Sequence, residues 1–283
     1  MSAKNKKSFP ALPAALLSMV SVQGGASIAK RLFPILGASG TSTLRIGLSA
    51  VLLLLFNRPK IFRLSKKQWL YCAAYGLCLG TMNLAFYFAI QRIPLGLGVA
   101  VEFTGPLALA LLLSRRLLDI LWALLACAGI MLIAPWQNDG LDMLGIVFAL
   151  IAGACWAGYI LIGGKITKIM KSSDAVTVGM LFATLLILPI GIISGDLSSL
   201  NWELLLIGLS IALLSSAIPY SLDLIALKKL PSKTFSILMS LQPAFGALSG
   251  LIFLKEILSF NQWTSIFCVI IASIGAVASS KKK

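Results

Sequence analysis

The chain alternates between long apolar runs and short polar or basic connections. Each run approaches the roughly 20 residues that a helix needs to cross about 30 Å of hydrocarbon. The runs and the glycine and proline breakers between them predict ten membrane-spanning helices, and the short connections make sequence neighbours antiparallel. We therefore expect an all-α integral membrane protein, with spans at approximately 11–29, 38–56, 69–90, 95–113, 118–135, 142–163, 174–194, 202–227, 233–254 and 262–279.

The composition agrees with this pattern. Hydrophobic residues make up 59% of the 283 positions and charged residues only 12%, against about 25% charged in a soluble domain. The five cysteines lie inside apolar runs without the spacing of metal ligands, so we expect neither a metal site nor a disulfide framework. Because the sequence has no histidine, proton chemistry near neutral pH falls to carboxylates.

Basic residues are concentrated in alternate connections. If the N-terminus lies in the cytoplasm, the two tails and the cytoplasmic connections hold 19 of the 24 lysines and arginines, whereas the opposite connections hold 4. The positive-inside rule then predicts that both termini are cytoplasmic. These residues form no stripe along an amphipathic element, so we expect no nucleic-acid partner. The basic N-terminal tail lacks a clear cleavage site, and the first span is interpreted as retained.

Two segments of the chain repeat one another. Residues 89–113 align without a gap with residues 226–250 at an offset of 137, and the alignment matches Pro94 with Pro231 and Pro106 with Pro243. Five spans per half is an odd number, so the second half is expected to be inverted relative to the first. Inverted repeats with broken helices are typical of alternating-access transporters, although a duplicated scaffold without transport remains an alternative. The predicted repeats are residues 1–137 and 138–283.

Three charged residues lie inside predicted spans and away from the span ends. Arg45 and Glu102 both lie about 10 Å below the outer boundary, so they can meet at similar depth. Either they form a structural clip, or Glu102 faces a central cavity and binds a proton or an ammonium group. Asp223 lies near the cytoplasmic end of its span, and we interpret it as an interfacial carboxylate near Lys228 or Lys229.

Two prolines, Pro106 and Pro243, interrupt the backbone hydrogen bonding of predicted spans four and nine. Pro106 has no N–H and leaves the carbonyl of Glu102 without its helical partner, and Pro243 does the same for Met239. We predict hinges at both prolines and a central site between them. Small residues at four-residue spacing in span six (Gly145, Ala149, Gly153 and Ala157) predict a close helix contact. Further predicted lining residues are Gln23, Asn83, Tyr87, Trp156, Tyr159, Tyr220, Ser240 and Gln242.

Three segments, VQGGASIAKRLFP, PLGLGVAVEFTGPLA and IPYSLDLIALKKLPSKTFSILMSLQPAFGALSGLIFLKE, resemble the bacterial threonine and homoserine exporters. These belong to the EamA branch of the drug/metabolite transporter superfamily, and the resemblance covers essentially the whole chain. It implies two inverted five-helix halves, a central cavity and efflux of small amino acids from the cytoplasm by exchange with protons. The family's glutamate in EFTGP corresponds to Glu102, and its PYSL-type segment to Pro219–Leu222.

We therefore predict a multi-pass transporter of the bacterial inner membrane that exports threonine-like or homoserine-like amino acids by proton antiport. The alternatives are a related exporter of another metabolite or drug (an aromatic amino acid, a lipophilic cation or a nucleotide precursor), and a membrane enzyme or sensory scaffold. No nucleophile–base pair or phosphate-binding loop supports an enzyme. We expect no cofactor, a proton gradient as the energy source, and a monomer whose partners are its substrate and the bilayer.

Overall fold

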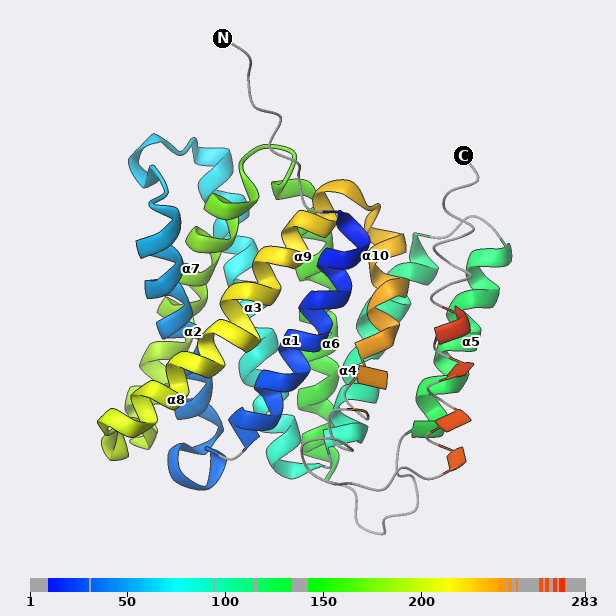
Figure 1. Cartoon of the computed structure of the whole chain (residues 1–283), viewed down its shortest axis with the longest axis horizontal. Helices are drawn as coiled ribbons and strands as arrows, with labels where there is room; N and C mark the ends of the chain where they lie inside the picture. The colour runs from blue at the N-terminus through cyan, green and yellow to red at the C-terminus, as the bar shows by residue number, and fades with distance from the viewer. Residues whose placement is uncertain are drawn as a thin grey trace.

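The computed structural model describes residues 10–30, 32–93, 95–113, 117–133, 142–242, 244–245, 248, 260–261, 263–264, 267–268 and 270–272. Within these residues the chain is helical and has no strand (Figure 1). The helices are α1 (Ala11–Lys30), α2 (Phe33–Asn57), α3 (Lys66–Arg92), α4 (Leu95–Leu112), α5 (Leu117–Ile133), α6 (Met143–Ile166), α7 (Ser172–Ile193), α8 (Trp202–Ala212), α9 (Ile218–Lys229) and α10 (Ser232–Leu238).

Short elements complete this order. Single 3₁₀ turns form at Ile61–Arg63, Asp196–Ser199 and Met239–Leu241, and a π turn at Leu213–Ala217 joins α8 to α9 in one apolar rod. Five helices are long and apolar enough to cross a membrane, namely Phe33–Asn57, Lys66–Arg92, Met143–Ile166, Ser172–Ile193 and Trp202–Lys229. With the shorter apolar helices they make the chain a multi-pass membrane protein, as predicted. The first nine predicted spans each coincide with a helix or with its start.

The two halves of the chain are interleaved. The central helix α3 packs against α6 and α7 of the second half, and the α8–α9 rod packs in turn against α1 and α2 of the first half. α2 and α7 also contact each other, and α4 lies along α6 (Figure 1). Each half therefore supplies one helix to the core of the other, and groups from both halves meet at the centre.

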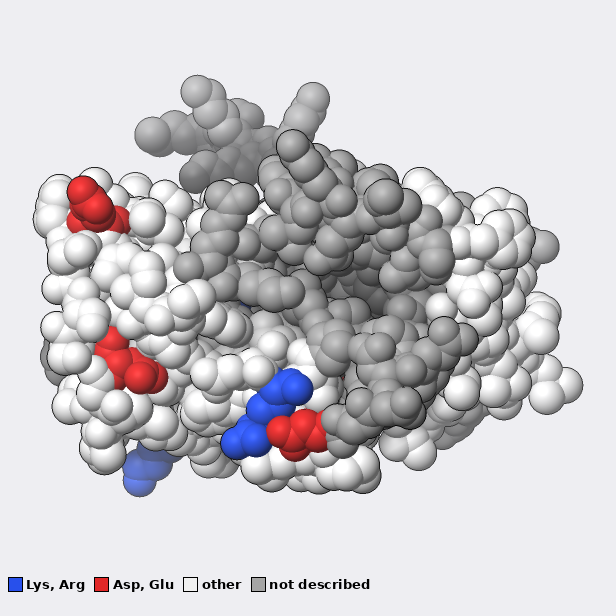
Figure 2. Space-filling view, turned by 90° about the horizontal axis from the view of Figure 1, so that it is seen from below, with Lys and Arg blue, Asp and Glu red and all other residues white. Residues whose placement is uncertain are grey.

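Basic side chains collect at one end of the bundle. The α2–α3, α6–α7 and α9–α10 connections share this end (Figure 1), and they carry Arg58, Lys60, Arg63, Lys66, Lys67, Lys165, Lys168, Lys171, Lys228, Lys229 and Lys233. The described side chains on the opposite face include few basic groups (Figure 2). This separation agrees with the charge pattern of the sequence, and the orientation in the membrane remains a prediction.

An ion pair ties α3 to α6 at the less basic end. Arg92 Nη1 lies 2.9 Å from Asp142 Oδ2, and the other carboxylate oxygen accepts hydrogen bonds from the backbone N–H groups of Leu144 and Gly145. Asp142 is therefore the N-cap of α6. The hydrogen bond from Arg92 and the two N–H donors favour the charged form, which lowers the pKa of Asp142 from its ordinary value.

α2 contains a break that explains why its predicted start falls at residue 38. Gly37 has φ 59° and ψ −178°, a conformation that glycine tolerates because it lacks a Cβ. The helix restarts after it, and the Asp196 carboxylate accepts hydrogen bonds from Ser39 Oγ and from the Gly40 N–H. A carboxylate from the α7–α8 connection thus caps the restarted helix across the repeat boundary.

The π turn before Pro219 was not predicted from the sequence. Pro219 cannot donate a backbone hydrogen bond, and carbonyl groups near the turn accept from hydroxyls of neighbouring helices instead. Ser49 Oγ donates to the carbonyl of Ala212 at 2.8 Å, Ser21 Oγ to Leu214 at 2.6 Å and Ser18 Oγ to Pro219 at 3.2 Å. The chain can therefore adopt the wider, underwound π turn here without leaving those carbonyls unpaired.

Two glycines bring α4 and α6 into backbone contact. A Cβ added to Gly153 would collide with the carbonyl oxygen of Glu102, and one added to Gly105 would collide with the backbone of Gly153. α4 continues as a helix through Pro106, so this proline removes one hydrogen bond without interrupting the helix. The carbonyl that it frees faces the Gly153 backbone, as the small-residue stripe on α6 predicts.

This contact predicts that Gly153→Ala lowers stability. The added methyl group meets backbone rather than a movable side chain, and overpacking of this kind costs about 1–3 kcal/mol. We expect a thermal unfolding midpoint in detergent several degrees lower, measured by tryptophan fluorescence.

Gly47→Ala is the matched control. Its new methyl group would meet only Thr184 Cγ2 at 3.8 Å, and alanine is the better helix former. An equal response of both variants would contradict a specific α4–α6 backbone contact.

Candidate functional site

A partly open cavity, with about 80 Å³ of space for the centres of water-sized molecules, lies where α1, α2, α3, α4, α6 and α9 converge. Nine of the ten predicted binding residues line it: Gln23, Arg45, Asn83, Tyr87, Glu102, Trp156, Tyr159, Tyr220 and Gln242. The tenth, the side chain of Ser240, lies outside the described residues, as does Pro243. The geometry gathers these residues, and their roles in binding remain predictions.

Arg45 lies at the centre of the polar wall. It is only 4% exposed, and its guanidinium donates to the hydroxyl of Tyr87 at 2.9 Å and to that of Tyr220 at 3.5 Å. Its guanidinium carbon also lies 4.9 Å from the centre of the Tyr87 ring, a cation–π contact. Arg45 Nε has no hydrogen-bond partner among the described residues. The buried Arg45 guanidinium therefore has one N–H donor, at Nε, and a positive charge that a further partner can bind.

Tyr220 links this cation to α3. Its hydroxyl donates to Asn83 Oδ1 at 2.9 Å, and Asn83 Nδ2 donates in turn to the carbonyl of Leu79 at 2.7 Å. Asn83 and Tyr220 are 137 residues apart, which is the offset of the sequence repeat. The hydrogen bond thus joins equivalent positions of the two predicted halves.

Glu102 faces the same cavity from α4 and is 8% exposed. Glu102 and Arg45 form no ion pair with each other among the described residues. The ion pair that occurs in this part of the chain joins Arg92 to Asp142. Arg45 is hydrogen-bonded to tyrosine hydroxyls instead, and it influences Glu102 electrostatically through space. This arrangement favours the cavity interpretation of Glu102 over the structural clip.

The interpretation of Asp223 as an interfacial carboxylate is wrong. Asp223 is 5% exposed and lines the cavity, and its Oδ2 accepts a hydrogen bond from the Tyr159 hydroxyl at 3.0 Å. Counting from the helix end gave only a depth, whereas the face of α9 on which Asp223 lies places it toward the interior of the bundle. Its neighbours Lys228 and Lys229 lie in the last turn of α9.

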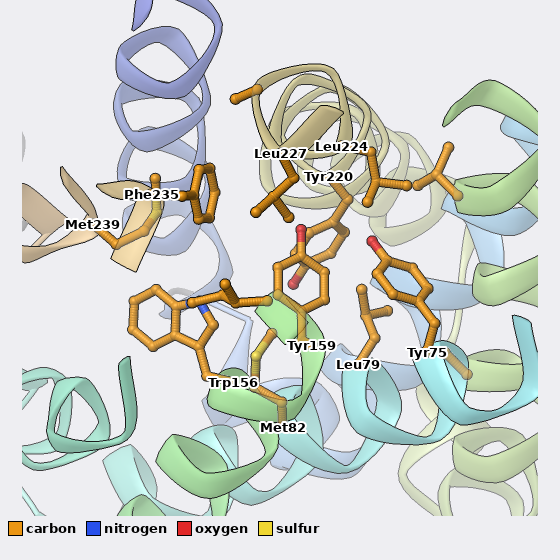
Figure 3. Packing of buried hydrophobic residues seen from close by; sticks show 14 of the residues in the cluster. Tyr75, Leu79, Met82, Trp156, Tyr159, Tyr220, Leu224, Leu227, Phe235 and Met239 are labelled. Atoms are coloured by element: carbon orange, nitrogen blue, oxygen red, sulfur yellow. The ribbon is translucent and has the colours of Figure 1, made fainter. Parts of the chain in front are cut away.

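Aromatic rings form much of the remaining wall (Figure 3). Tyr159 packs against Tyr75 and Tyr220 with ring centres 5.1 and 5.8 Å apart, and Trp156 meets Phe103 edge-on at 5.9 Å. Figure 3 shows Tyr75, Tyr159 and Tyr220 converging from three helices. These rings hold the hydroxyl groups beside Arg45 and Asp223 in fixed positions.

Two glutamines close another part of the wall. Gln23 Nε2 donates to Gln242 Oε1 at 2.8 Å and joins α1 to the segment after α10. Gly25 of α1 lies against Ser215 in the π turn, where a Cβ would collide with the serine side chain. The QGG motif of α1 therefore combines a lining amide with a close helix approach.

Sequence reasoning missed the apolar part of the lining and one acid. Met82 and Phe86 are the residues just before Asn83 and Tyr87 on α3. Residues four apart share a helix face, so the pair Met82 and Phe86 could have been predicted to face the cavity beside the pair Asn83 and Tyr87. The missed residues are Val22, Ala26, Met82, Phe86, Val99 and Asp223. In the part of the chain that the structure describes, no cluster of three metal-ligating side chains occurs.

The cavity thus combines a cation, two carboxylates and hydrogen-bonding hydroxyl and amide groups with an apolar remainder. Such a set matches a small zwitterion: the arginine fork suits a carboxylate, and a carboxylate oxygen suits an ammonium group. Apolar side chains exclude water and strengthen these charge interactions.

Comparison with known proteins identifies the family. The chain is 44% identical over 270 residues to the threonine/homoserine exporter RhtA of Escherichia coli (strain K12), which covers 95% of this chain and 91% of that protein. RhtA of Salmonella typhimurium (strain SL1344) matches to the same extent. The EamA-like transporter family profile matches residues 143–278. The chain belongs to the EamA-like transporter family.

Two more distant relatives agree with this membership. The uncharacterized transporter YwfM of Bacillus subtilis (strain 168) is 26% identical over 260 residues. A solved crystal structure of a protein 13% identical to this chain matches 95% of it and 99% of that protein with a TM-score of 0.73, which shows the fold alone. This EamA-like transporter is thus a multi-pass protein of the bacterial inner membrane, and its close relatives are transporters rather than enzymes.

The Asn83–Tyr220 hydrogen bond generates a test of the site's geometry. Tyr220→Phe and Asn83→Leu each remove one partner, and a buried hydrogen bond contributes about 0.5–1.5 kcal/mol. In a double-mutant cycle we expect a coupling free energy of about 0.5 kcal/mol or more, measured by denaturant unfolding in detergent.

Tyr71→Phe serves as the control for this cycle, because Tyr71 lies on the same α3 and no hydrogen bond of its hydroxyl is found among the described residues. Combined with Asn83→Leu it should give additive effects. Additivity of Tyr220→Phe with Asn83→Leu would contradict the direct contact.

Proposed function

We propose that this EamA-like transporter exports small amino acids of the threonine and homoserine type from the cytoplasm by proton antiport. The single observation that carries the proposal is the central cavity, where Arg45 and Glu102 lie within electrostatic reach but are not paired with each other. Unpaired opposite charges in a water-poor site are costly unless a ligand completes them. The 44% identical relatives are threonine/homoserine exporters, which supports the same substrate class.

In the proposed mechanism the substrate carboxylate approaches Arg45, whose Nε has no hydrogen-bond partner among the described residues. The ammonium group meets Glu102. Tyr87 and Tyr220 keep the guanidinium in one orientation through their hydroxyl groups. When no substrate is bound, Glu102 takes a proton, so that proton and amine occupy the carboxylate in turn.

The proposed architecture has ten spans in two inverted repeats, residues 1–137 and 138–283, with both termini in the cytoplasm. Two contacts support it. α3 and the α8–α9 rod each pack into the opposite half, as a two-fold relation requires. Asn83 and Tyr220 hold equivalent positions in the two proposed repeats and are hydrogen-bonded to each other. Equivalent residues of two repeats can touch only if they lie beside the two-fold axis that relates the repeats. Pro106 and Pro243 remain the proposed hinge positions.

Transport of this kind needs no resident cofactor, and we propose that a single copy of the chain is the working unit, because the cavity is formed within one chain. An exporter of lipophilic cations is disfavoured by Arg45, which would repel such a substrate from the centre of the cavity.

The test is uptake of labelled threonine into inside-out vesicles with an acidic lumen. In this orientation, protons leaving the lumen drive the substrate inwards. We expect uptake by the wild type. We expect Glu102→Gln to reduce it about tenfold or more, because the amide keeps the shape but loses the charge that meets the ammonium group.

Glu203→Gln is the matched control, because Glu203 lies exposed in the first turn of α8, away from the cavity. It should transport like the wild type. Equal uptake by wild type and Glu102→Gln would exclude the proposed role of the carboxylate, and absence of uptake by the wild type would exclude threonine as a substrate.

A further inference from the structure

We propose that Asp223 is a second proton-binding carboxylate of the cavity and that its proton, rather than that of Glu102 alone, couples export to the proton gradient. This inference rests on the proposed function. It assigns a coupling role to a residue that the sequence pattern had suggested lies at the membrane surface.

The geometry around Asp223 is asymmetric. Oδ2 accepts a hydrogen bond from the Tyr159 hydroxyl at 3.0 Å, whereas Oδ1 is buried and has no hydrogen-bond partner among the described residues. A carboxylate with one oxygen unpaired at 5% exposure is strongly disfavoured, and a carboxyl group that carries a proton is not. The residue also lines the cavity, so water can deliver and remove that proton.

The groups around Asp223 explain why a proton is the expected partner. α1 contributes Ser18, whose hydroxyl donates to the Pro219 carbonyl, and α3 and α6 contribute Tyr75 and Tyr159. On its own helix the nearest such group is Tyr220. Hydroxyl groups stabilise either form of a carboxyl group but do not neutralise its charge.

Few charged groups lie on the neighbouring described helices. Arg45 of α2 is hydrogen-bonded to Tyr220, and Glu102 of α4 shares the cavity. On the remaining neighbours, α7 and α10, the described ionisable residues are Asp174 and Lys233, each in the first turn of its helix. No described cation forms an ion pair with Asp223.

The net charge of the cavity links the proton to the substrate. Once the Glu102 proton has left to make room for the substrate, the charges of Arg45 and Glu102 cancel as long as Asp223 is protonated. With Asp223 deprotonated, the cavity carries one net negative charge, which attracts the substrate ammonium group. Loss of the Asp223 proton to cavity water therefore favours substrate entry without being required for it, and reprotonation of the carboxylate from the other side of the membrane favours substrate release.

The test separates substrate binding from coupling. Wild type and Asp223→Asn are reconstituted in liposomes, and two assays are run. One is counterflow of labelled threonine at equal pH on both sides, which needs binding and reorientation only. The other is accumulation of threonine driven by an acidic lumen, which also needs proton coupling.

We expect Asp223→Asn to keep counterflow within about twofold of the wild type, since the amide preserves shape and cavity contacts. Accumulation should fall to the equilibrium level. Asp174→Asn, the same substitution on a carboxylate outside the cavity, should retain both activities.

Retained accumulation in Asp223→Asn would overturn the proposal and leave Glu102 as the only coupling carboxylate. Lost counterflow in a folded Asp223→Asn protein would also overturn it and make Asp223 a substrate contact. If the proposed function itself is wrong, the wild type will show no threonine counterflow at any pH, an outcome distinct from both.

Tyr159→Phe keeps the inference testable if Asp223→Asn does not fold. It removes the 3.0 Å hydrogen bond but leaves the carboxyl group in place. We expect the pH at which accumulation is half-maximal to shift. An unchanged pH profile would contradict a proton site at Asp223.

Discussion

Burial of the Arg45 guanidinium inside a membrane bundle is the constraint on which the rest of the site depends. A charge near the centre of a span costs about 2.5–3.5 kcal/mol even on insertion scales, so each donor needs a partner or access to a cavity. The hydroxyl groups of Tyr87 and Tyr220 supply two partners. Because hydroxyl groups are neutral, the positive charge itself is left for Glu102 and for a ligand.

The helix packing provides what this arrangement requires. Tyr220 of α9 accepts a hydrogen bond from Arg45, and carbonyls near the preceding π turn accept hydrogen bonds from Ser18, Ser21 and Ser49. Glu102 reaches the same depth because Gly105 lets α4 lie directly against α6. Small residues and hydroxyl groups thus determine the position of the charges, although none of them is charged.

The sequence predicts the helices well because each apolar run is long and its breakers are strong, and it predicts Arg45 and Glu102 because isolated charges in such runs are rare. It does not predict Asp223 or the start of α2. The position of Asp223 depends on which face of α9 packs inward, and the start of α2 on the break at Gly37, whose capping partner Asp196 is remote in sequence. A helical wheel assumes regular winding and fails where winding changes.

The charges break the symmetry that the scaffold keeps. At the repeat offset, Glu102 corresponds to Met239 and Asp223 to Phe86, so neither carboxylate has a counterpart in the other half. α3 and the α8–α9 rod each pack into the opposite half of the chain. Binding groups present only once, beside the Asn83–Tyr220 contact, stay in one place while the helices around them rearrange. A single central site that opens in turn to each face of the membrane would meet the physical requirement for the proposed exchange of a proton against a substrate.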